Sequence, residues 1–305
     1  MPLAMQAETA IEDIQLIADA GMAVSTAIHN AILAGGEPVR HIADLLHGTW
    51  LGHPLHPVLT DITIGAWTLG TLFDAAAEIT HSHELRKSAD HAQFVGTISA
   101  IPTAITGIVD YSTFPEPTSS PATLHAVLNL VNFGLYIGSV QARRNGNRRR
   151  GVMLSTIGFG LTCVSAWIGG SLVYKYRLGV NQADDFDKPK RFKAVMNLND
   201  LPLKKAVKVD VDGKDVMVYR DERRIYAIGA KCAHAAGPLE EGKVQGGCVE
   251  CPWHHSVFDM RNGRVVHGPA CQPQQAFDVR VRGGKVELRV QPKPGRAEMR
   301  NQRDS

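Results

Sequence analysis

The chain has 305 residues, of which 44% are hydrophobic and 21% charged, and its formal net charge is +3 at pH 7. This length favours two domains, and the charge is divided unevenly: residues 1–174 carry 8 Lys or Arg against 13 Asp or Glu, residues 175–305 carry 25 against 17. The basic C-terminal part lacks the interleaved aromatic residues of nucleic-acid-binding domains, which argues against a nucleic-acid partner and favours an acidic partner protein or an anionic membrane.

Residues 1–52 are expected to form amphipathic helices. Apolar residues recur at helical spacing over residues 11–20 and 42–46, and Gly35 and Gly36 separate the two segments. Both segments look too polar to cross a bilayer, and no basic signal-peptide region opens the chain. We therefore expect these helices to pack against other helices or to lie at a membrane surface.

Residues 53–174 are expected to form an all-α domain of four transmembrane helices. Apolar runs cover about 55–79, 92–112, 122–141 and 152–174, each near the roughly 20 residues that a helix needs to cross a bilayer. The stretch LGHPLHPVLTDITIGAW, with HPLHP at residues 53–57, resembles a bacterial four-helix membrane domain of unknown function, DUF2231-like, over about residues 45–174. That resemblance implies a membrane partner and a fold, and it supplies no chemistry.

Charges in the loops predict the orientation of this domain. Arg86 and Lys87 lie in the first loop and five arginines lie within residues 143–150 of the third, whereas the second loop, FPEPTSSP, has no basic residue. The positive-inside rule then places the first and third loops in the cytoplasm and both termini outside, in a multi-pass protein of a bacterial inner membrane. The segment NRRRGVML at residues 147–154 resembles a twin-arginine export signal, which would carry a folded C-terminal domain across; a simple topology anchor and a cytoplasmic C-terminal domain stay open as alternatives.

Five ionisable residues of the predicted spans fall near one membrane face, the face that also receives the C-terminal domain. Three readings stay open: structural pairing of Asp with His, a quinol or proton-relay site, and a b-type heme bound through His56 and His125. The five residues are His53, His56, Asp61, Asp110 and His125.

Residues 175–191, rich in Asp and Lys, are expected to be a polar tether. Residues 192–290 read as short strands joined by turns at residues 212–213, 262–263 and 283–284, which predicts an antiparallel all-β domain. The charged, Pro-containing tail at 291–305 is expected to be disordered. The predicted fold class is thus multi-domain, an all-α transmembrane four-helix domain followed by an all-β domain.

The β domain contains a four-ligand metal motif. Cys232 and His234 are followed after sixteen residues by Cys251 and His254, so each half offers one thiolate and one imidazole. A structural zinc site uses the same residue types, but zinc fingers usually pair two Cys in one arm and two His in the other. A [2Fe-2S] cluster with Cys on one iron and His on the other fits the mixed arms better.

These boxes resemble the Rieske [2Fe-2S] family: CAHAAGPL is similar to its first box, CPWHHSVFD to its second, and GPA at residues 268–270 to the proline loop over the cluster. The resemblance implies that the two Cys hold the buried iron and the two His the outer iron, with Ser256, Phe258 and Pro269 around the cluster.

Two features depart from the family. Gly237 and Trp253 stand where Rieske proteins of cytochrome bc complexes have a disulfide, and Phe258 stands where they have a Tyr. The loss of that hydroxyl predicts a potential below the top of the Rieske range. His255 replaces the family's usual Gly.

The function expected from these features is a membrane-anchored Rieske protein that carries single electrons between a membrane-side donor, with quinol as a candidate, and a redox partner. Alternatives are a ferredoxin-like donor to an oxygenase or reductase and a redox sensor. Rieske oxygenases need a mononuclear iron in a further large domain, and only about 35 residues follow Pro269. The chain is therefore expected to be an electron-transfer protein or an oxidoreductase subunit without a substrate-transforming site of its own.

Overall fold

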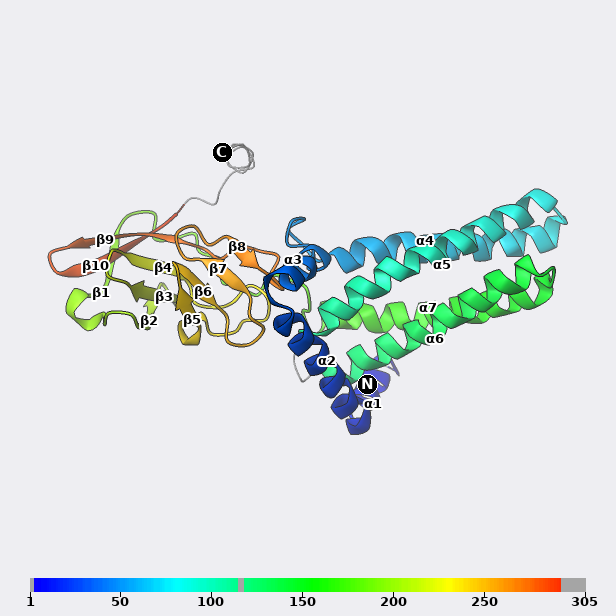
Figure 1. Ribbon diagram of the computed structural model, residues 1–305, viewed down its shortest axis with the longest axis horizontal. Helices are drawn as coiled ribbons and strands as arrows, with labels where there is room; N and C mark the ends of the chain where they lie inside the picture. Colours follow the sequence, from blue (N-terminus) through cyan, green and yellow to red (C-terminus); the bar gives the residue numbers. More distant parts are fainter. Residues whose placement is uncertain (1–2, 115–117, 292–305) are drawn as a thin grey trace. The chain divides into compact units, whose positions relative to one another are not determined.

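The computed structural model describes residues 3–114 and 118–291, and the chain divides into two compact units, Met1–Gly179 and Val180–Ser305 (Figure 1). The first unit is helical and the second is built of strands, as the sequence predicts. The predicted disordered tail falls, beyond residue 291, outside the described residues.

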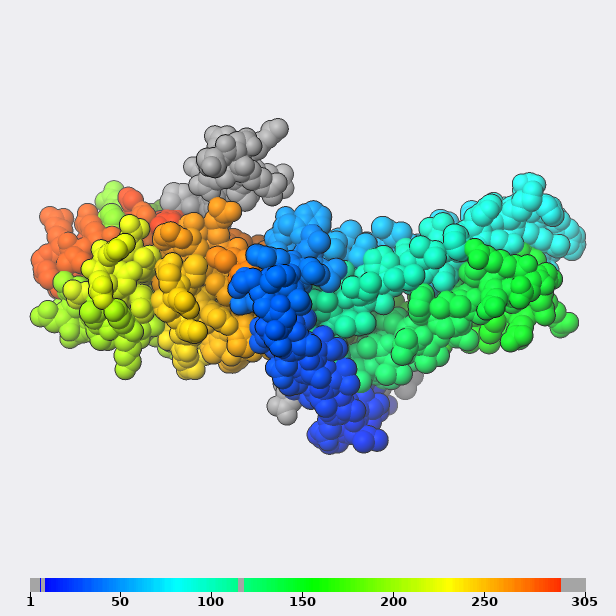
Figure 2. Space-filling view, viewed as in Figure 1, coloured from blue at the N-terminus to red at the C-terminus, as the bar shows by residue number. Residues whose placement is uncertain are grey.

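Three helices open the first unit: α1 (Leu3–Glu12), α2 (Gln15–Ala34) and α3 (Gly36–His47). The backbone of Gly36 is left-handed, at φ +67°, which explains why the chain breaks between α2 and α3 at a glycine. Helix α2 lies on the surface of the helical unit (Figure 2), with only Gly21 and Ser25 buried. It is long and apolar enough to cross a membrane, contrary to the expectation that this region is too polar.

Four longer helices follow as two hairpins: α4 (Leu55–Thr80) with α5 (His83–Tyr111), and α6 (Ser119–Arg144) with α7 (Arg148–Tyr174). Helices α5, α6 and α7 are, like α2, long and apolar enough to span a membrane. Helix α4 has 26 residues and is long enough to span a membrane, but its polar residues keep it from being one of the helices that are also apolar enough.

A partly buried ion network joins the four helices at the end where each hairpin turns. The Arg143 guanidinium donates to Asp74 at 3.0 Å and to Asp90 at 2.7 Å, and Arg148 donates to the same two carboxylates at 2.5 Å. The side chains of Arg143 and Asp74 are 3% and 5% exposed. Because each helix contributes one charged residue, the network fixes the two hairpins to each other at this end.

The second unit contains three antiparallel sheets (Figure 1). The predicted turns at residues 212–213 and 283–284 are confirmed, since each joins two strands that pair as an antiparallel hairpin. The strands are β1 (Lys193–Asn197), β10 (Lys285–Val290) and β9 (Phe277–Arg282) in one sheet; β2 (Ala206–Val211), β3 (Lys214–Arg220) and β4 (Ile225–Gly229) in the next; and β5 (Lys243–Gln245), β6 (Cys248–Glu250), β7 (Val257–Asp259) and β8 (Val265–His267) in the third.

The predicted polar tether, residues 175–191, is exposed at most positions, but Phe186 and Pro189 are buried. Phe186 is 5% exposed and meets Phe277 edge to face, with ring centroids 5.1 Å apart, so this part of the segment belongs to the β unit. On the helical side, the Leu178 N–H donates to Leu172 at 3.0 Å. Burial of the Phe186 ring therefore anchors the segment at one point although its neighbours are polar.

Candidate metal centre

Two loops of the β unit carry the four predicted ligands, and both have the same hydrogen-bond frame. In the first, the Cys232 N–H donates to the Gly237 carbonyl at 2.9 Å and the Ala236 N–H donates back to Cys232 at 2.9 Å. In the second, the Cys251 N–H donates to Ser256 at 2.8 Å and the His255 N–H donates back to Cys251 at 3.1 Å. Each loop is thus a closed turn that presents its Cys and His from one side.

The two loops place sulfur inside and imidazole outside. Cys232 and Cys251 are 1% and 2% exposed and belong to the core of the unit, whereas His234 and His254 are half-buried. The two imidazole rings lie 5.0 Å apart at 85°. Their Nδ1 atoms are buried and make no hydrogen bond, although both rings have other interactions. Two buried nitrogens and two buried sulfurs fit a [2Fe-2S] cluster held by Cys on one iron and His on the other.

The electrostatics of the sulfur pair favour one thiolate. A hydrogen bond from the Cys232 thiol, with help from the backbone N–H groups of Trp253 and His254, lowers the pKa of Cys251 to about 7. The Cys232 thiol donates that bond and is buried, which raises its own pKa. The second thiolate therefore needs a positive charge such as iron to form at neutral pH.

The segment resembling a proline loop is attached to the second cluster loop by one buried hydrogen bond. The Ala270 N–H donates to the Ser256 hydroxyl at 3.0 Å, and Ser256 is fully buried. This bond holds Pro269 beside the metal-binding loops. Phe258, also fully buried, lies in β7 within the core that surrounds the two Cys.

The structure explains why His255 stands at a position where Gly is usual. His255 and Ala236 occupy the equivalent place in the two loops, and both have left-handed backbones, at φ 61° and φ 64°. Such a backbone favours glycine and is tolerated by His more often than by most residues. The His255 imidazole lies 2.6 Å from the Glu250 carboxylate, which offsets part of the strain.

The helical unit separates the predicted membrane-face residues instead of gathering all of them. His53 is exposed and bonds to the carbonyl of Pro54 at 3.0 Å, and Asp61 is exposed. Asp110 pairs at 2.8 Å with His47, the buried last residue of α3, which the sequence analysis did not single out. The signal for His47 is weak, because its partner lies in another helix 63 residues away.

His56 and His125 are held alike. The Nδ1 atom of His56 lies 2.9 Å from the Thr103 carbonyl of α5, and the Nδ1 atom of His125 lies 2.9 Å from the Ser165 carbonyl of α7. Of the five predicted residues, these two thus share one arrangement, in which the imidazole contacts a backbone carbonyl of the neighbouring helix.

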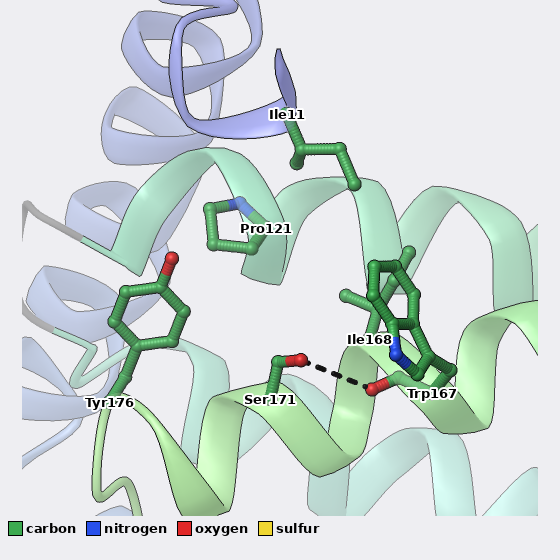
Figure 3. Close-up of a pocket in the computed structure, with 6 residues that line it drawn as sticks. All are labelled: Ile11, Pro121, Trp167, Ile168, Ser171 and Tyr176. Carbon is green, nitrogen blue, oxygen red and sulfur yellow. Dashed lines mark hydrogen bonds between the residues drawn. The ribbon is translucent and has the colours of Figure 1, made fainter. Parts of the chain in front are cut away.

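A pocket elsewhere in the helical unit lies between α1, α6 and α7 (Figure 3). Its Ser171 hydroxyl donates to the Trp167 carbonyl of its own helix at 3.4 Å, as a membrane helix satisfies its polar side chains. The lining is largely apolar and offers no group of residues suited to a reaction. The residues are Ile11, Pro121, Trp167, Ile168, Ser171 and Tyr176.

Comparison with known families gives two matches on this chain. Residues 191–280 match the Rieske [2Fe-2S] domain, and residues 52–182 match a predicted membrane protein family, DUF2231. Both resemblances found in the sequence are therefore confirmed, including their fusion in one chain.

Curated relatives match the β unit. A ferredoxin component of naphthalene 1,2-dioxygenase and salicylate 5-hydroxylase systems from Ralstonia sp is 31% identical over 31% of this chain and 90% of its own length. The ferredoxin subunit of anthranilate 1,2-dioxygenase from Burkholderia cepacia is 35% identical over 25% of this chain and 71% of its own. Among solved structures, the ferredoxin of carbazole 1,9a-dioxygenase from Nocardioides aromaticivorans IC177 is 38% identical over 33% of this chain and 98% of its own, with a TM-score of 0.31.

Proposed function

The chain belongs to the Rieske [2Fe-2S] family, and from this we propose that it carries single electrons between a donor at the membrane and a redox partner protein. The observation that supports this most is the pair of matched loops, with buried sulfurs and half-buried imidazoles. A [2Fe-2S] cluster accepts and releases one electron at a time, and no further reaction is required of this chain.

We propose that Cys232 and Cys251 bind the inner iron and that His234 and His254 bind the outer one. The burial of the sulfurs and of the two Nδ1 atoms supports this division. Ser256, Phe258 and Pro269 surround the cluster in this proposal. The imidazoles are the part of the site nearest to solvent, so electrons would leave on their side.

Trp253 lies in the second metal-binding loop, directly before His254, and is 52% exposed. An exposed aromatic residue within a metal-binding loop suits contact with a partner protein, because aromatic side chains dominate such interfaces. The relatives named as ferredoxin components of dioxygenase systems support an oxygenase or reductase as the acceptor. A redox sensor is the second candidate, in which the cluster is reduced without passing the electron on.

On the donor side, we propose that electrons enter through the membrane unit, from a quinol or by way of a b-type heme. The helices that match the membrane family and are apolar enough to span a bilayer support this placement. We further propose a bacterial inner membrane, with the β unit on the extracytoplasmic side.

The first test is an EPR-monitored redox titration of the full chain purified in detergent. We expect a Rieske signal that Cys251→Ser abolishes, because that variant removes a proposed ligand. Cys248→Ser is the matched control, since Cys248 lies three residues earlier in β6 and is no ligand in the proposal. A wild-type protein with iron and sulfide but no Rieske signal would refute the assignment.

A stopped-flow experiment separates conduction from sensing. A conducting protein, once reduced, is reoxidised rapidly when an oxidised dioxygenase or cytochrome is added. Reduction that persists in the presence of every such acceptor would favour the sensor.

A further inference from the structure

The helical unit contains an internal duplication that the sequence analysis did not detect. Residues of α4 recur in α6 at one constant offset, and residues of α5 recur in α7 at another. The correspondence is clearest between TAITG at residues 103–107 and SAWIG at residues 165–169. In α4 and α6 the pairs are His56 with His125, Thr63 with Asn132, Trp67 with Tyr136 and Asp74 with Arg143; in α5 and α7 they are Gly96 with Gly158, Thr103 with Ser165 and Gly107 with Gly169.

Corresponding residues of the two hairpins meet each other. The rings of Trp67 and Tyr136 are stacked, with centroids 3.8 Å apart and planes 3° from parallel. Asp74 and Arg143 form the ion pair described for the other end of the bundle. Equivalent positions touch only where a two-fold axis passes between them, so an approximate two-fold axis relates the two hairpins.

His56 and His125 lie on the same corresponding positions and are oriented alike. Each Nδ1 atom lies 2.9 Å from a backbone carbonyl, of Thr103 in one hairpin and of its counterpart Ser165 in the other. A carbonyl oxygen can only accept, so Nδ1 carries the proton and Nε2 of the neutral ring carries the lone pair. This is the arrangement of metal-binding histidines, whose second nitrogen is fixed by a carbonyl or carboxylate.

Glycines allow the rings to lie against the neighbouring helix. A Cβ atom on Gly107 would lie 2.8 Å from the His56 ring, and one on Gly169 would lie 3.0 Å from the His125 ring. Thus the same three parts, an imidazole, a carbonyl acceptor and a glycine four residues after it, occur twice. Independent packing histidines have no reason to share all three.

Residue burial in the bundle differs between the end with the ion network and the level of these histidines. Toward the ion network the bundle is closed by the Trp67–Tyr136 stack, with both residues at least 95% buried. At the level of the histidines the residues are less buried, since His56 and His125 are half-buried and Asn129 is exposed. The Asn129 side chain donates to His125 Nε2 at 3.0 Å, which agrees with a lone pair on that nitrogen.

We propose that His56 and His125 are the two axial ligands of a b-type heme, bound between the hairpins with its iron on the approximate two-fold axis. Two histidines alone provide too few ligands for a free metal ion. Among the described residues, no third metal-binding side chain joins them. A porphyrin supplies four further ligands itself. The inference rests on the proposed function in one respect: the heme would be the membrane-side partner of the cluster.

The test is an optical spectrum of the full chain, expressed with a heme precursor and purified in detergent. We expect a Soret band whose reduced-minus-oxidised difference is that of low-spin six-coordinate heme. His56→Ala and His125→Ala should each lose the band, and added imidazole should restore it if the helices are folded. His53→Ala is the matched control, because His53 is three residues from His56 and exposed, and it should keep the full band.

The Rieske EPR signal, recorded on the same samples, separates the two proposals, since the cluster ligands lie in the other unit. A normal EPR signal with no Soret band, even after addition of hemin, would overturn the heme site and leave the cluster proposal intact. A band retained in both His→Ala variants would also overturn it. Quinone recovered in stoichiometric amount from heme-free protein would replace heme with a quinol as the occupant.

Discussion

Among single residues, Gly237 shows how closely the two cluster loops approach. A Cβ atom there would lie 2.8 Å from the Cys251 sulfur and 3.1 Å from the Trp253 ring. We therefore expect Gly237→Ala to displace a proposed ligand and to lower iron and sulfide content several-fold. Gly246→Ala is the control, since its added Cβ would meet nothing within 4 Å although its φ is +62°; it should cost about 1 kcal/mol of stability and keep the cluster. Full cluster content in Gly237→Ala would contradict this geometry.

Ser256 allows a prediction about the potential. Its hydroxyl accepts from the Ala270 N–H and can still donate its own hydrogen toward the cluster. Ser256→Ala removes both bonds and leaves a buried N–H without its acceptor, at a cost of about 1–3 kcal/mol. Because hydrogen bonds stabilise the reduced cluster, we expect a lower midpoint potential in a redox titration. A potential that stays the same or rises would show that the hydroxyl does not reach the cluster.

The residues that the sequence revealed are those whose chemistry is local. Cys232 with His234, and Cys251 with His254, stand within turns of a few residues, so their spacing alone was enough to propose a metal site. His47 and the Trp67–Tyr136 stack were missed because each partner comes from a distant helix and no short pattern joins them. For the left-handed backbone at His255 the residue itself gives no sign, and the indication lies in the family's usual Gly at that position.

At the level of helices, the ion network should be the main support of the bundle's closed end. Arg143→Ala would leave Asp74 buried with only Arg148, and breaking a buried pair costs about 3–5 kcal/mol. We expect a clear fall in thermal stability in detergent, and part of it should return in the double variant Arg143→Ala with Asp74→Ala. Arg149→Ala is the control, since Arg149 is exposed. Equal stability of the Arg143 and Arg149 variants would argue against the network.

The attachment of α1 should depend on pH. Glu12 accepts from Lys175 Nζ at 2.7 Å and from the Tyr176 hydroxyl, and these bonds lower the pKa of Glu12. Burial and the same carboxylate raise the pKa of Tyr176 to about 12. A lowered carboxyl pKa stabilises the attached state above the ordinary value of about 4.3, and this stabilisation is lost as pH falls through the folded pKa. Hydrogen exchange in α1 should therefore accelerate in acid, and Glu12→Gln should show fast exchange already at neutral pH.

The helices and hairpins were largely predictable because periodicity and turn residues are local properties. Two features were not predictable in this way. Helix α2 is apolar on average although its small residues gave a weak pattern, and the expected tether is anchored at Phe186 because this ring packs against Phe277 far along the chain.

For the whole molecule, the ion network affects which arginines can determine the predicted membrane orientation. Arg143 and Arg148 are bound to Asp74 and Asp90, so these two arginines are not free to act as topological signals. Arg144, Arg149 and Arg150 are exposed, which keeps a positive excess at this end of the bundle. The expected side of the β unit is therefore still extracytoplasmic.

Arg149 and Arg150 also decide between a topology anchor and a twin-arginine export signal. Replacing both by Lys keeps the charge, so an anchor should work as before, whereas a twin-arginine signal depends on the arginines themselves. We expect the double variant to leave the β unit in the cytoplasm. The measurement is the labelling, in intact cells, of a cysteine introduced at Ser305 by a thiol reagent that does not cross the membrane. The comparison is with the same cysteine in a chain that keeps both arginines. Labelling that is unchanged by the double variant would identify the pair as an anchor. If the reagent fails to label the β unit even with both arginines present, while labelling it in opened cells, the unit is cytoplasmic, and its electrons must then be exchanged with partners on that side.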